Sequence, residues 1–184
     1  MLASRSPRRS VLLRDAGYDI EVRPADVEEH QRSDESPRAY VSRLAVDKAI
    51  AVSQRYPEQI VIGADTVVVL DDVVFGKPLD RAEAVGMLTK LAGRTHTVLT
   101  GVVVRRASTV FKGVESTEVT FVELTRARID WYVSRGESDD KAGAYAAQGV
   151  GSRLIERING SYTNVVGLPM AMVDRFVRKF ERNL

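Results

Sequence analysis

The stretch Ile60–Leu70 constrains the fold of this chain more than any other part of the sequence. It reads Ile-Val-Ile-Gly-Ala-Asp-Thr-Val-Val-Val-Leu, and such a β-branched run predicts a central strand that is buried on both faces. Asp65 stands in the middle of this strand. Because an ionised carboxylate is costly to bury unless it is paired, hydrogen-bonded or bound to a metal, the stretch predicts a buried acid with a dedicated partner.

Two interpretations of Asp65 follow from its neighbours. Gly63 and Ala64 leave space beside the backbone, which suits a strand where a ligand approaches closely. In the alternative, Asp65 caps a turn between two shorter strands and Thr66 bonds to the local backbone. Apolar residues continue for four positions beyond Thr66, and this continuity favours the functional interpretation.

The overall composition excludes several classes of protein. The chain has 184 residues, 44% of them apolar, which is enough for one sizeable domain or two small lobes. No segment approaches the roughly 18 consecutive apolar residues of a membrane span. The absence of cysteine rules out disulfides, thiolate catalysis and cysteine-bound zinc, and a net charge of +2 is too weak to indicate binding to duplex nucleic acid. We therefore expect a soluble, cytoplasmic protein without a membrane partner or a specific nucleic-acid partner.

The N-terminal segment places two cations at the start of a predicted helix. After a short strand, a helix is expected from Pro7 to about Ala16. Arg8 and Arg9 then lie in its first turn, where cations oppose the helix dipole unless an anion is shared between them and the free amides. The segment that begins at Ser4 is therefore interpreted as a phosphate cradle. A pair of solvated arginines is the alternative.

A second predicted helix carries a lysine on its apolar side. Ser36 and Pro37 indicate a helix start, and the helix should run to about Tyr56. Lys48 falls on the core-facing stripe by helical spacing, so its ammonium either extends to the edge of the core or meets an anion. Because the helix leads directly into the strand of Asp65, the second possibility is favoured.

The rest of the chain alternates predicted strands and helices, which indicates an α/β fold. The two longest alternating runs read as an antiparallel pair, so we expect a mixed, twisted sheet with flanking helices. The expected strands are Tyr18–Pro24, Val73–Phe75, Thr95–Arg105, Val110–Glu123 and Arg153–Ile158, and the expected helices are Arg81–Leu91, Thr125–Gly136 and Pro169–Arg182.

The remaining candidate site residues are acids and cations. His30 and His96 are too scattered for a two-histidine metal site. Lys77 presents a cation at a tight turn that is not a Walker A loop, and the loop Asp139–Gly149 either lines a site or merely turns the chain. Oxygen ligands together with Lys and Arg suit a polyphosphate held by magnesium. The acids are Glu29, Asp65 and Asp140, and the cations are Arg8, Arg9, Lys48, Lys77 and Lys141.

Short segments that look like motifs follow one another along the chain: Leu2–Arg9, Glu35–Pro37 with Arg43–Ala45 and Lys48-Ala49, Gly63–Val68, Gly76–Pro78, Asp140–Tyr145 with Gln148-Gly149, and Asn164–Pro169. Taken together and in order, these segments resemble the motifs of the Maf family. The resemblance covers nearly the whole chain, and several independent motifs at family-like spacing make it specific.

The resemblance implies a fold, an activity and a set of site residues. It implies that residues 1–184 form a single nucleoside triphosphate pyrophosphatase domain, with an inosine-triphosphatase-like α/β fold and two lobes around a cleft. Asp65 would be the proton acceptor, and Glu29 and Asp65 would bind a divalent cation, Mg²⁺ or Mn²⁺. The implied phosphate ligands are Ser4, Arg9, Lys48 and Lys77.

The resemblance also implies which base is recognised. Within the family, the positions of Arg8, Thr66 and Gln148 separate members that prefer dTTP and UTP from members that prefer 7-methyl-GTP, which tend to carry Trp, Gln and Glu there. A neutral Gln148 offers both a donor and an acceptor to a pyrimidine edge, and Arg8 would repel a cationic base. We expect hydrolysis of dTTP and UTP to the nucleoside monophosphate and pyrophosphate, with CTP and modified pyrimidine triphosphates as further candidates.

Two other functions stay open at this stage. The family has been linked to septum formation, so the chain could be a regulator that senses nucleotides without turnover. A phosphatase that acts on the terminal phosphate would release inorganic phosphate instead of pyrophosphate. A homodimer is a candidate assembly in each case.

Overall fold

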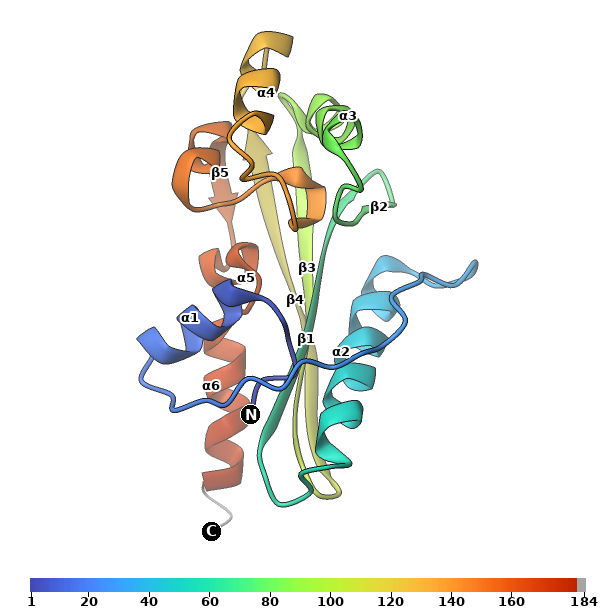
Figure 1. Ribbon diagram of the computed structural model, residues 1–184, viewed down its shortest axis with the longest axis vertical. Coiled ribbons are helices and arrows are strands. Elements are labelled where there is room, and N and C mark those ends of the chain that lie inside the picture. The colour runs from blue at the N-terminus through green and yellow to red at the C-terminus, as the bar shows by residue number, and fades with distance from the viewer. Residues whose placement is uncertain (182–184) are drawn as a thin grey trace. The chain divides into compact units, whose positions relative to one another are not determined.

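The computed structural model of the chain describes residues 1–181 (Figure 1). Helices and strands alternate along most of the sequence, as expected for an α/β fold. The α-helices are α1 (Pro7–Asp15), α2 (Pro37–Ser53), α3 (Arg81–Leu91), α4 (Arg126–Val133), α5 (Tyr162–Val166) and α6 (Met170–Glu181); the 3₁₀ helices are η1 (Ala142–Ala144) and η2 (Gly149–Leu154); the strands are β1 (Val61–Leu70), β2 (Val73–Phe75), β3 (Thr95–Arg106), β4 (Thr109–Phe121) and β5 (Ile155–Asn159).

A five-stranded sheet in the order β2-β1-β3-β4-β5 forms the centre of the fold. β1 pairs antiparallel with β2, and β4 pairs antiparallel with β5. β3 and β4 are neighbours joined by a tight turn at Ala107, so they also run antiparallel. The predicted α/β class, with a sheet and flanking helices, is confirmed. None of the helices within residues 1–181 has the length and apolar content needed to cross a membrane.

The chain divides into two compact units. The first unit comprises Met1–Thr66, Thr100–Glu115 and Gly167–Leu184, and the second comprises Val67–Leu99 and Ser116–Val166. Three strands, β1, β3 and β4, therefore contribute residues to both units.

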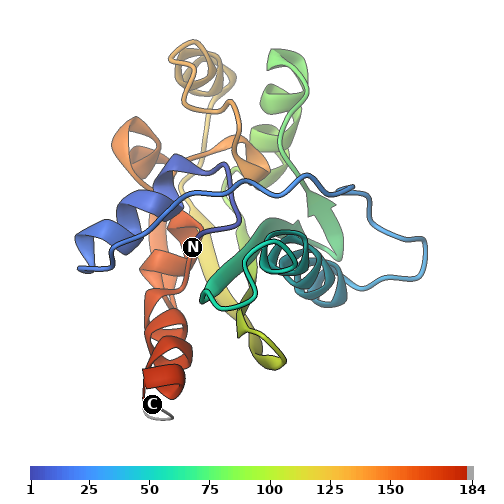
Figure 2. The same cartoon turned by 60° about the horizontal axis from the view of Figure 1, so that its bottom comes forward.

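In the first unit, helices cover both faces of the strands. α2 lies on one face, and α1 and α6 lie on the other, as the views in Figures 1 and 2 agree. The approach of α2 is very close, because a Cβ atom added to Gly63 would lie 2.3 Å from the Ala45 carbonyl oxygen and one added to Gly101 would lie 2.2 Å from the Val41 carbonyl oxygen. The two glycines thus allow helix backbone and strand backbone to touch.

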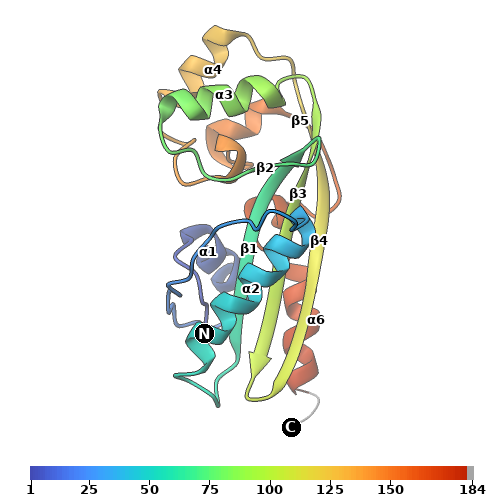
Figure 3. The ribbon, with the colours of Figure 1, turned by 90° about the vertical axis from the view of Figure 1, so that its right-hand side faces the viewer.

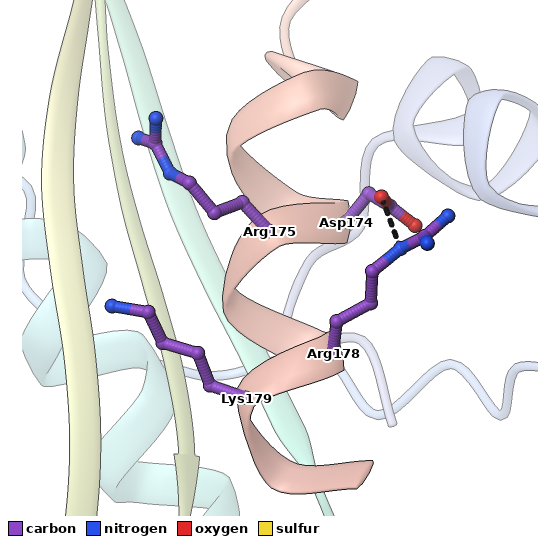
Figure 4. A pocket seen from close by; sticks show the side chains of 4 residues that line it. All are labelled: Asp174, Arg175, Arg178 and Lys179. Carbon is purple, nitrogen blue, oxygen red and sulfur yellow. Dashed lines mark hydrogen bonds and ion pairs between the residues drawn. The ribbon is translucent and has the colours of Figure 1, made fainter. Parts of the chain in front are cut away.

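Helix α6 closes the other face of the first unit with an apolar side. Phe176 and Phe180 pack against Phe111 of β4, with ring centroids 6.2 and 5.0 Å away. The outer side is basic, and Figure 4 shows Asp174 paired with Arg178 among the residues that line a pocket there. The Arg178 Nε lies 2.7 Å from the Asp174 Oδ2. The charged side chains lie outside because only the apolar stripe of the helix meets the core.

The second unit has its own apolar core. α3 packs against α4 and η1, and Figure 3 shows α3 and α4 side by side. A group of three rings lies inside this core. His96 contacts Phe121 and Tyr145 edge-on, with ring centroids 4.9 and 5.3 Å apart. The predicted helix Arg81–Leu91 is confirmed, and the Asp80 side chain caps it by accepting a hydrogen bond from the Glu83 amide at 2.8 Å.

Several predicted boundaries are wrong. Tyr18–Pro24 is not a strand, because only Val22 makes an isolated parallel bridge, to Leu2. The predicted strand Arg153–Ile158 begins inside η2, because the last turn of that 3₁₀ helix runs to Leu154.

Other differences concern helices. α2 ends at Ser53, before the predicted Tyr56, and neither the 3₁₀ helices nor α5 was expected. The predicted end of the last helix, Arg182, lies outside the described residues.

Candidate active site

The site begins with two adjacent residues of β1 whose side chains point to opposite faces. Side chains alternate along a strand, so Asp65 shares a face with Val61, which packs in the core beneath α2. Thr66 shares the other face with Ile62 and Ala64, which pack in the core beneath α1 and α6. β1 therefore presents an acid to one layer of helices and a hydroxyl to the other.

Lys48 of α2 meets the acid on its own face. The Lys48 Nζ lies 2.7 Å from the Asp65 Oδ1 and 2.6 Å from the Glu29 Oε1. The Lys48 and Asp65 side chains are only 9% and 10% exposed, whereas the Glu29 side chain is 49% exposed. The sequence left open whether Lys48 reaches solvent or meets an anion, and the second possibility is confirmed. Three of the predicted site residues thus converge on one point of the first unit.

The surroundings of Asp65 favour a proton acceptor. Burial raises the pKa of the Asp65 carboxyl above its ordinary value, and the ammonium of Lys48 and the guanidinium of Arg9 counteract part of this rise. A raised pKa brings a carboxylate nearer to the basicity that a general base needs at neutral pH. The alternative in which Asp65 caps a turn is wrong, because β1 is one uninterrupted strand.

The Glu29 side chain depends on a loop that α2 holds in place. The loop has no helix or strand of its own. The Tyr40 hydroxyl donates to the Glu29 carbonyl oxygen at 2.9 Å, and the Arg43 Nη2 donates to the His30 carbonyl oxygen at 2.9 Å. Arg43 also forms a bidentate pair with the Glu35 carboxylate, with both distances 2.7 Å. Tyr40 and Arg43, which the sequence did not indicate as site residues, therefore anchor the loop at Glu29 and on its C-terminal side.

On the other face, Arg9 is buried and bonded through all three of its side-chain nitrogens. Its Nε donates to the Gly167 carbonyl oxygen at 2.8 Å. Its Nη1 donates to the Ala64 carbonyl oxygen at 2.8 Å and to the Ser4 Oγ at 3.0 Å. Its Nη2 donates to the Thr66 Oγ1 at 2.9 Å. The alternative of a solvated arginine pair is thus wrong for Arg9, which is 7% exposed.

A threonine pair extends this network. The Thr66 Oγ1 lies 2.9 Å from the Thr100 Oγ1 and 3.3 Å from the Gly167 carbonyl oxygen. Thr100 is fully buried on β3. One interpretation of the sequence supposed that the Thr66 hydroxyl bonds to its local backbone. That interpretation is wrong, because the hydroxyl bonds to Thr100 and Gly167 instead. Thr100 was missed, and the only signal was a polar residue in the middle of an apolar strand.

The N-terminal segment approaches the same network. Its backbone pairs with β1, since the Ala3 amide donates to the Ile62 carbonyl oxygen at 2.8 Å. Ser4 follows directly and is buried. Ser6 starts α1 without a capping bond from its own side chain; its amide donates to the Ser4 Oγ at 3.2 Å. Arg8 is half-buried on α1, and its role stays a prediction.

Four predicted site residues belong to the second unit, and their roles also stay predictions: Lys77, Asp140, Lys141 and Gln148. Lys77 is exposed after β2, and Gln148 is exposed directly before η2. The loops that carry them are linked within this unit, because the Gly143 amide donates to the Gly76 carbonyl oxygen at 3.0 Å. The carboxylate of Glu137 holds the turn after Gln148 by accepting hydrogen bonds from the amides of Val150 and Gly151, at 2.9 and 2.8 Å.

The donor set fits a hard divalent cation. Glu29 and Asp65 both approach a single cationic centre, the Lys48 ammonium. Residues 1–181 contain no cluster of three or more His, Asp or Glu side chains that could hold a metal. Mg²⁺ is commonly held by one or two carboxylates together with substrate phosphates, so two carboxylates are enough for such an ion.

Comparison with known proteins adds a family to this geometry. Similar proteins named dTTP/UTP pyrophosphatase occur in Symbiobacterium thermophilum, with 51% identity over 98% of this chain and 93% of the relative, in Anaeromyxobacter dehalogenans strain 2CP-C, with 49% identity over 97% and 92%, and in Latilactobacillus sakei, with 43% identity over 97% and 98%. The family model described as Maf-like protein matches residues 1–180. This match includes the buried acid with its lysine and the arginine network. Because it spans nearly the whole chain, the chain is a member of the Maf family.

Proposed function

We propose that the chain is a nucleoside triphosphate pyrophosphatase that converts dTTP and UTP to the nucleoside monophosphate and pyrophosphate. CTP and modified pyrimidine triphosphates such as 5-methyl-UTP are further candidate substrates. Residues 1–184 act as a single domain in this proposal. The names of the similar proteins support it, since each is called a dTTP/UTP pyrophosphatase.

One observation in the structure carries the proposal. Asp65 is a buried carboxylate held at 2.7 Å by a buried lysine, with a pKa raised by its burial. A buried ion pair of this kind is weak evidence for stability, and perturbed acids of this kind cluster at functional sites. The proposal is also supported by the position of Asp65 on β1, directly before Thr66, which bonds to Arg9.

The mechanism follows from these roles. Asp65 orients a water molecule, or accepts its proton, as the water attacks the α-phosphorus. The Lys48 ammonium keeps Asp65 in place and neutralises charge that develops on the phosphates. Glu29 and Asp65 would hold Mg²⁺ or Mn²⁺, which supplies neutralisation of the leaving pyrophosphate when it is bound.

The other contacts are proposed from the family resemblance. Ser4 and Lys77 contact phosphate, and Gln148 reads the pyrimidine edge. Arg8 and Thr66 contribute to the choice of base. A cytoplasmic location is part of the same proposal, in line with the nucleotide substrate and the absence of cysteine.

The test is a panel of nucleoside triphosphates with both phosphate products quantified. The proposal expects pyrophosphate and the nucleoside monophosphate from dTTP and UTP, and little product from 7-methyl-GTP. Chelation should abolish turnover, and Mg²⁺ or Mn²⁺ should restore it. Inorganic phosphate as the first product would indicate a terminal phosphatase, and tight binding without product would indicate a nucleotide-sensing regulator.

A further inference from the structure

The guanidinium of Arg9 has little hydrogen-bonding capacity left for a ligand. An arginine side chain has five N–H donors. Four of them bond to protein oxygens: those of Gly167, Ala64, Ser4 and Thr66. Within residues 1–181, at most one Nη2 hydrogen has no such partner. A bidentate grip on a phosphate would need two donors on one edge of the guanidinium, and both of its Nη1 hydrogens are already committed.

The partners of Arg9 come from several parts of the first unit, which fixes the plane of the guanidinium. One bond reaches the backbone of β1 at Ala64, and another reaches Gly167, before α6. Gly167 has φ 124°, a conformation that glycine adopts readily. A planar fork held at three of its nitrogens cannot turn toward a ligand without breaking several buried hydrogen bonds.

Ser4, unlike Arg9, keeps its hydrogen-bond donor available for a ligand. Its Oγ accepts hydrogen bonds from the Arg9 Nη1 at 3.0 Å and from the Ser6 amide at 3.2 Å. A hydroxyl oxygen accepts two hydrogen bonds and donates one. Both acceptor positions are therefore occupied, and the Ser4 hydroxyl donates to no side chain or backbone oxygen in the described part of the chain. Its hydrogen is directed away from Arg9, and the adjacent positive charge strengthens it as a donor.

The Thr66 hydroxyl is also held by Arg9, through the Nη2 of the guanidinium. Its Oγ1 accepts from the Arg9 Nη2 and also bonds to Thr100 and to the Gly167 carbonyl oxygen. Arg9 therefore holds the Thr66 hydroxyl as well as the Ser4 hydroxyl.

We infer that Arg9 is a positioning residue, which acts on the triphosphate through the Ser4 hydroxyl and does not bind a phosphate directly. Arg9 orients Ser4 so that its hydrogen points at the anion, and it supplies a fixed positive charge behind that donor. The same guanidinium fixes Thr66. The inference rests on the proposed function, because it assumes a triphosphate beside Ser4, and it replaces the direct phosphate contact that the family resemblance implies for Arg9.

A double-mutant cycle of Arg9→Lys and Ser4→Ala tests the inference. Both kcat/KM for UTP and the affinity for the non-hydrolysable analogue α,β-imido-UTP are measured. Each single change should lower kcat/KM roughly tenfold to a hundredfold, as expected for a lost hydrogen bond to a charged group. If Arg9 acts through Ser4, the double variant should be no worse than the poorer single variant. If the losses of the two single variants multiply in the double variant, Arg9 acts independently of Ser4, either by binding phosphate directly or by supporting the fold. That result would overturn the inference.

Two controls keep the outcome interpretable. Arg14→Lys makes the same change on the exposed side of α1 and should leave kcat/KM and the affinity unchanged. If Arg9→Lys does not fold, the side-chain ¹⁵N resonances of Arg9 in the wild type decide the question. They should shift little when α,β-imido-UTP binds, and a large shift at Nη would overturn the inference. A wild type that binds the analogue but releases no pyrophosphate from UTP overturns the proposed function alone, because the cycle can still be measured in affinity.

Discussion

The first unit buries Lys48, Asp65 and Arg9 as charges, whereas the second unit buries His96 and Tyr145 as neutral rings. In the first unit each buried charge has short bonds to partners from other elements. In the second unit, His96 and Tyr145 share one hydrogen bond of 2.8 Å, and within residues 1–181 the His96 Nδ1 has no partner.

The buried charges of the first unit suit a functional site, whereas the buried neutral rings of the second unit suit a packed core. Keeping charges buried is costly, and replacing them with apolar groups is often neutral or stabilising, so the charged group of the first unit indicates function. The neutral rings of the second unit pack with Phe121 as a core does. The following predictions, from the largest expected effect to the smallest, test this contrast.

The largest effect is expected at Asp65. Asp65→Asn should lower kcat by about a hundredfold to ten-thousandfold, the usual contribution of a general base. The melting temperature should stay equal or rise, because the amide is cheaper to bury and Lys48 retains Glu29 at 2.6 Å. Pyrophosphate release and thermal unfolding are measured on the same preparation.

The control for this change is Asp71→Asn, at the exposed turn after β1, where the residue has φ 50°. Asn tolerates that conformation, so activity should be unchanged. An Asp65→Asn variant that keeps its activity, or one that loses activity only because it unfolds, would remove Asp65 from the mechanism.

The second effect concerns the stability of the second unit in acid. Burial lowers the pKa of His96 from 6.5 to about 4, so the folded chain resists protonation that the unfolded chain accepts. The stability contribution is present above pH 6.5 and is lost as the pH falls toward 4. Its full size is about 3 kcal/mol.

His96→Gln, which cannot titrate, should flatten this part of the curve of unfolding free energy against pH. Denaturant unfolding between pH 7 and pH 4 measures the difference between the two proteins. Parallel curves for the wild type and the variant would show that His96 does not carry this dependence.

The third effect tests whether the charged group of the first unit depends on its anchors. Arg43→Gln removes the pair with Glu35 and the bond to the His30 carbonyl oxygen. It should weaken the binding of Mn²⁺ about tenfold to a hundredfold, which is typical when the support of a metal ligand is lost. Electron paramagnetic resonance of free Mn²⁺ measures the affinity without turnover.

Asp47→Asn is the matched control for this variant, because it removes only the weaker partner of Arg43, at 3.4 Å. Its Mn²⁺ affinity should equal that of the wild type. Equal affinity in Arg43→Gln would mean that Glu29 does not need this anchor, or does not bind the metal.

The smallest effect concerns Gln148 in the second unit. Gln148→Glu should lower the catalytic efficiency for UTP by roughly tenfold, since one paired contact with the base is lost. Gln54→Glu, an equivalent change on the exposed end of α2, should have no effect. Adding Arg8→Trp and Thr66→Gln should move the preference toward 7-methyl-GTP.

Efficiencies for UTP, dTTP and 7-methyl-GTP give the ranking of substrates. A wild type that already prefers 7-methyl-GTP would refute the assignment of the base. A triple variant with the wild-type ranking would show that these three residues do not select it.

The sequence predicted the elements whose signals are local. The α2 start was correct because the Ser36 side chain accepts from the Ala39 amide, a bond that spans one turn. The buried β1 and its acid were also correct, because burial follows from composition along a single strand. The strand predicted at Tyr18–Pro24 was wrong, because only Val22 pairs there. Whether several consecutive residues pair depends on a partner strand, which a local sequence pattern does not show.

The partners of the site residues show the same limit. The lysine on the apolar stripe of α2 predicted an anion, and the structure supplies it. The four bonds of Arg9 were not predictable, since Ala64 and Gly167 lie 55 and 158 positions away along the chain. Thr100 was missed for the same reason, because its role exists only once β3 lies beside β1.

The glycines beneath α2 limit how this protein can be re-engineered. Any side chain at Gly63 or Gly101 would collide with the carbonyl oxygens of Ala45 or Val41, and the helix would have to move outward. Lys48 is on that helix, so the displacement would stretch its bond to Asp65. A library of variants designed for new substrates should therefore keep both glycines fixed. Diversity is better introduced in the loop around Glu29, where changes leave the spacing of helix and strand intact.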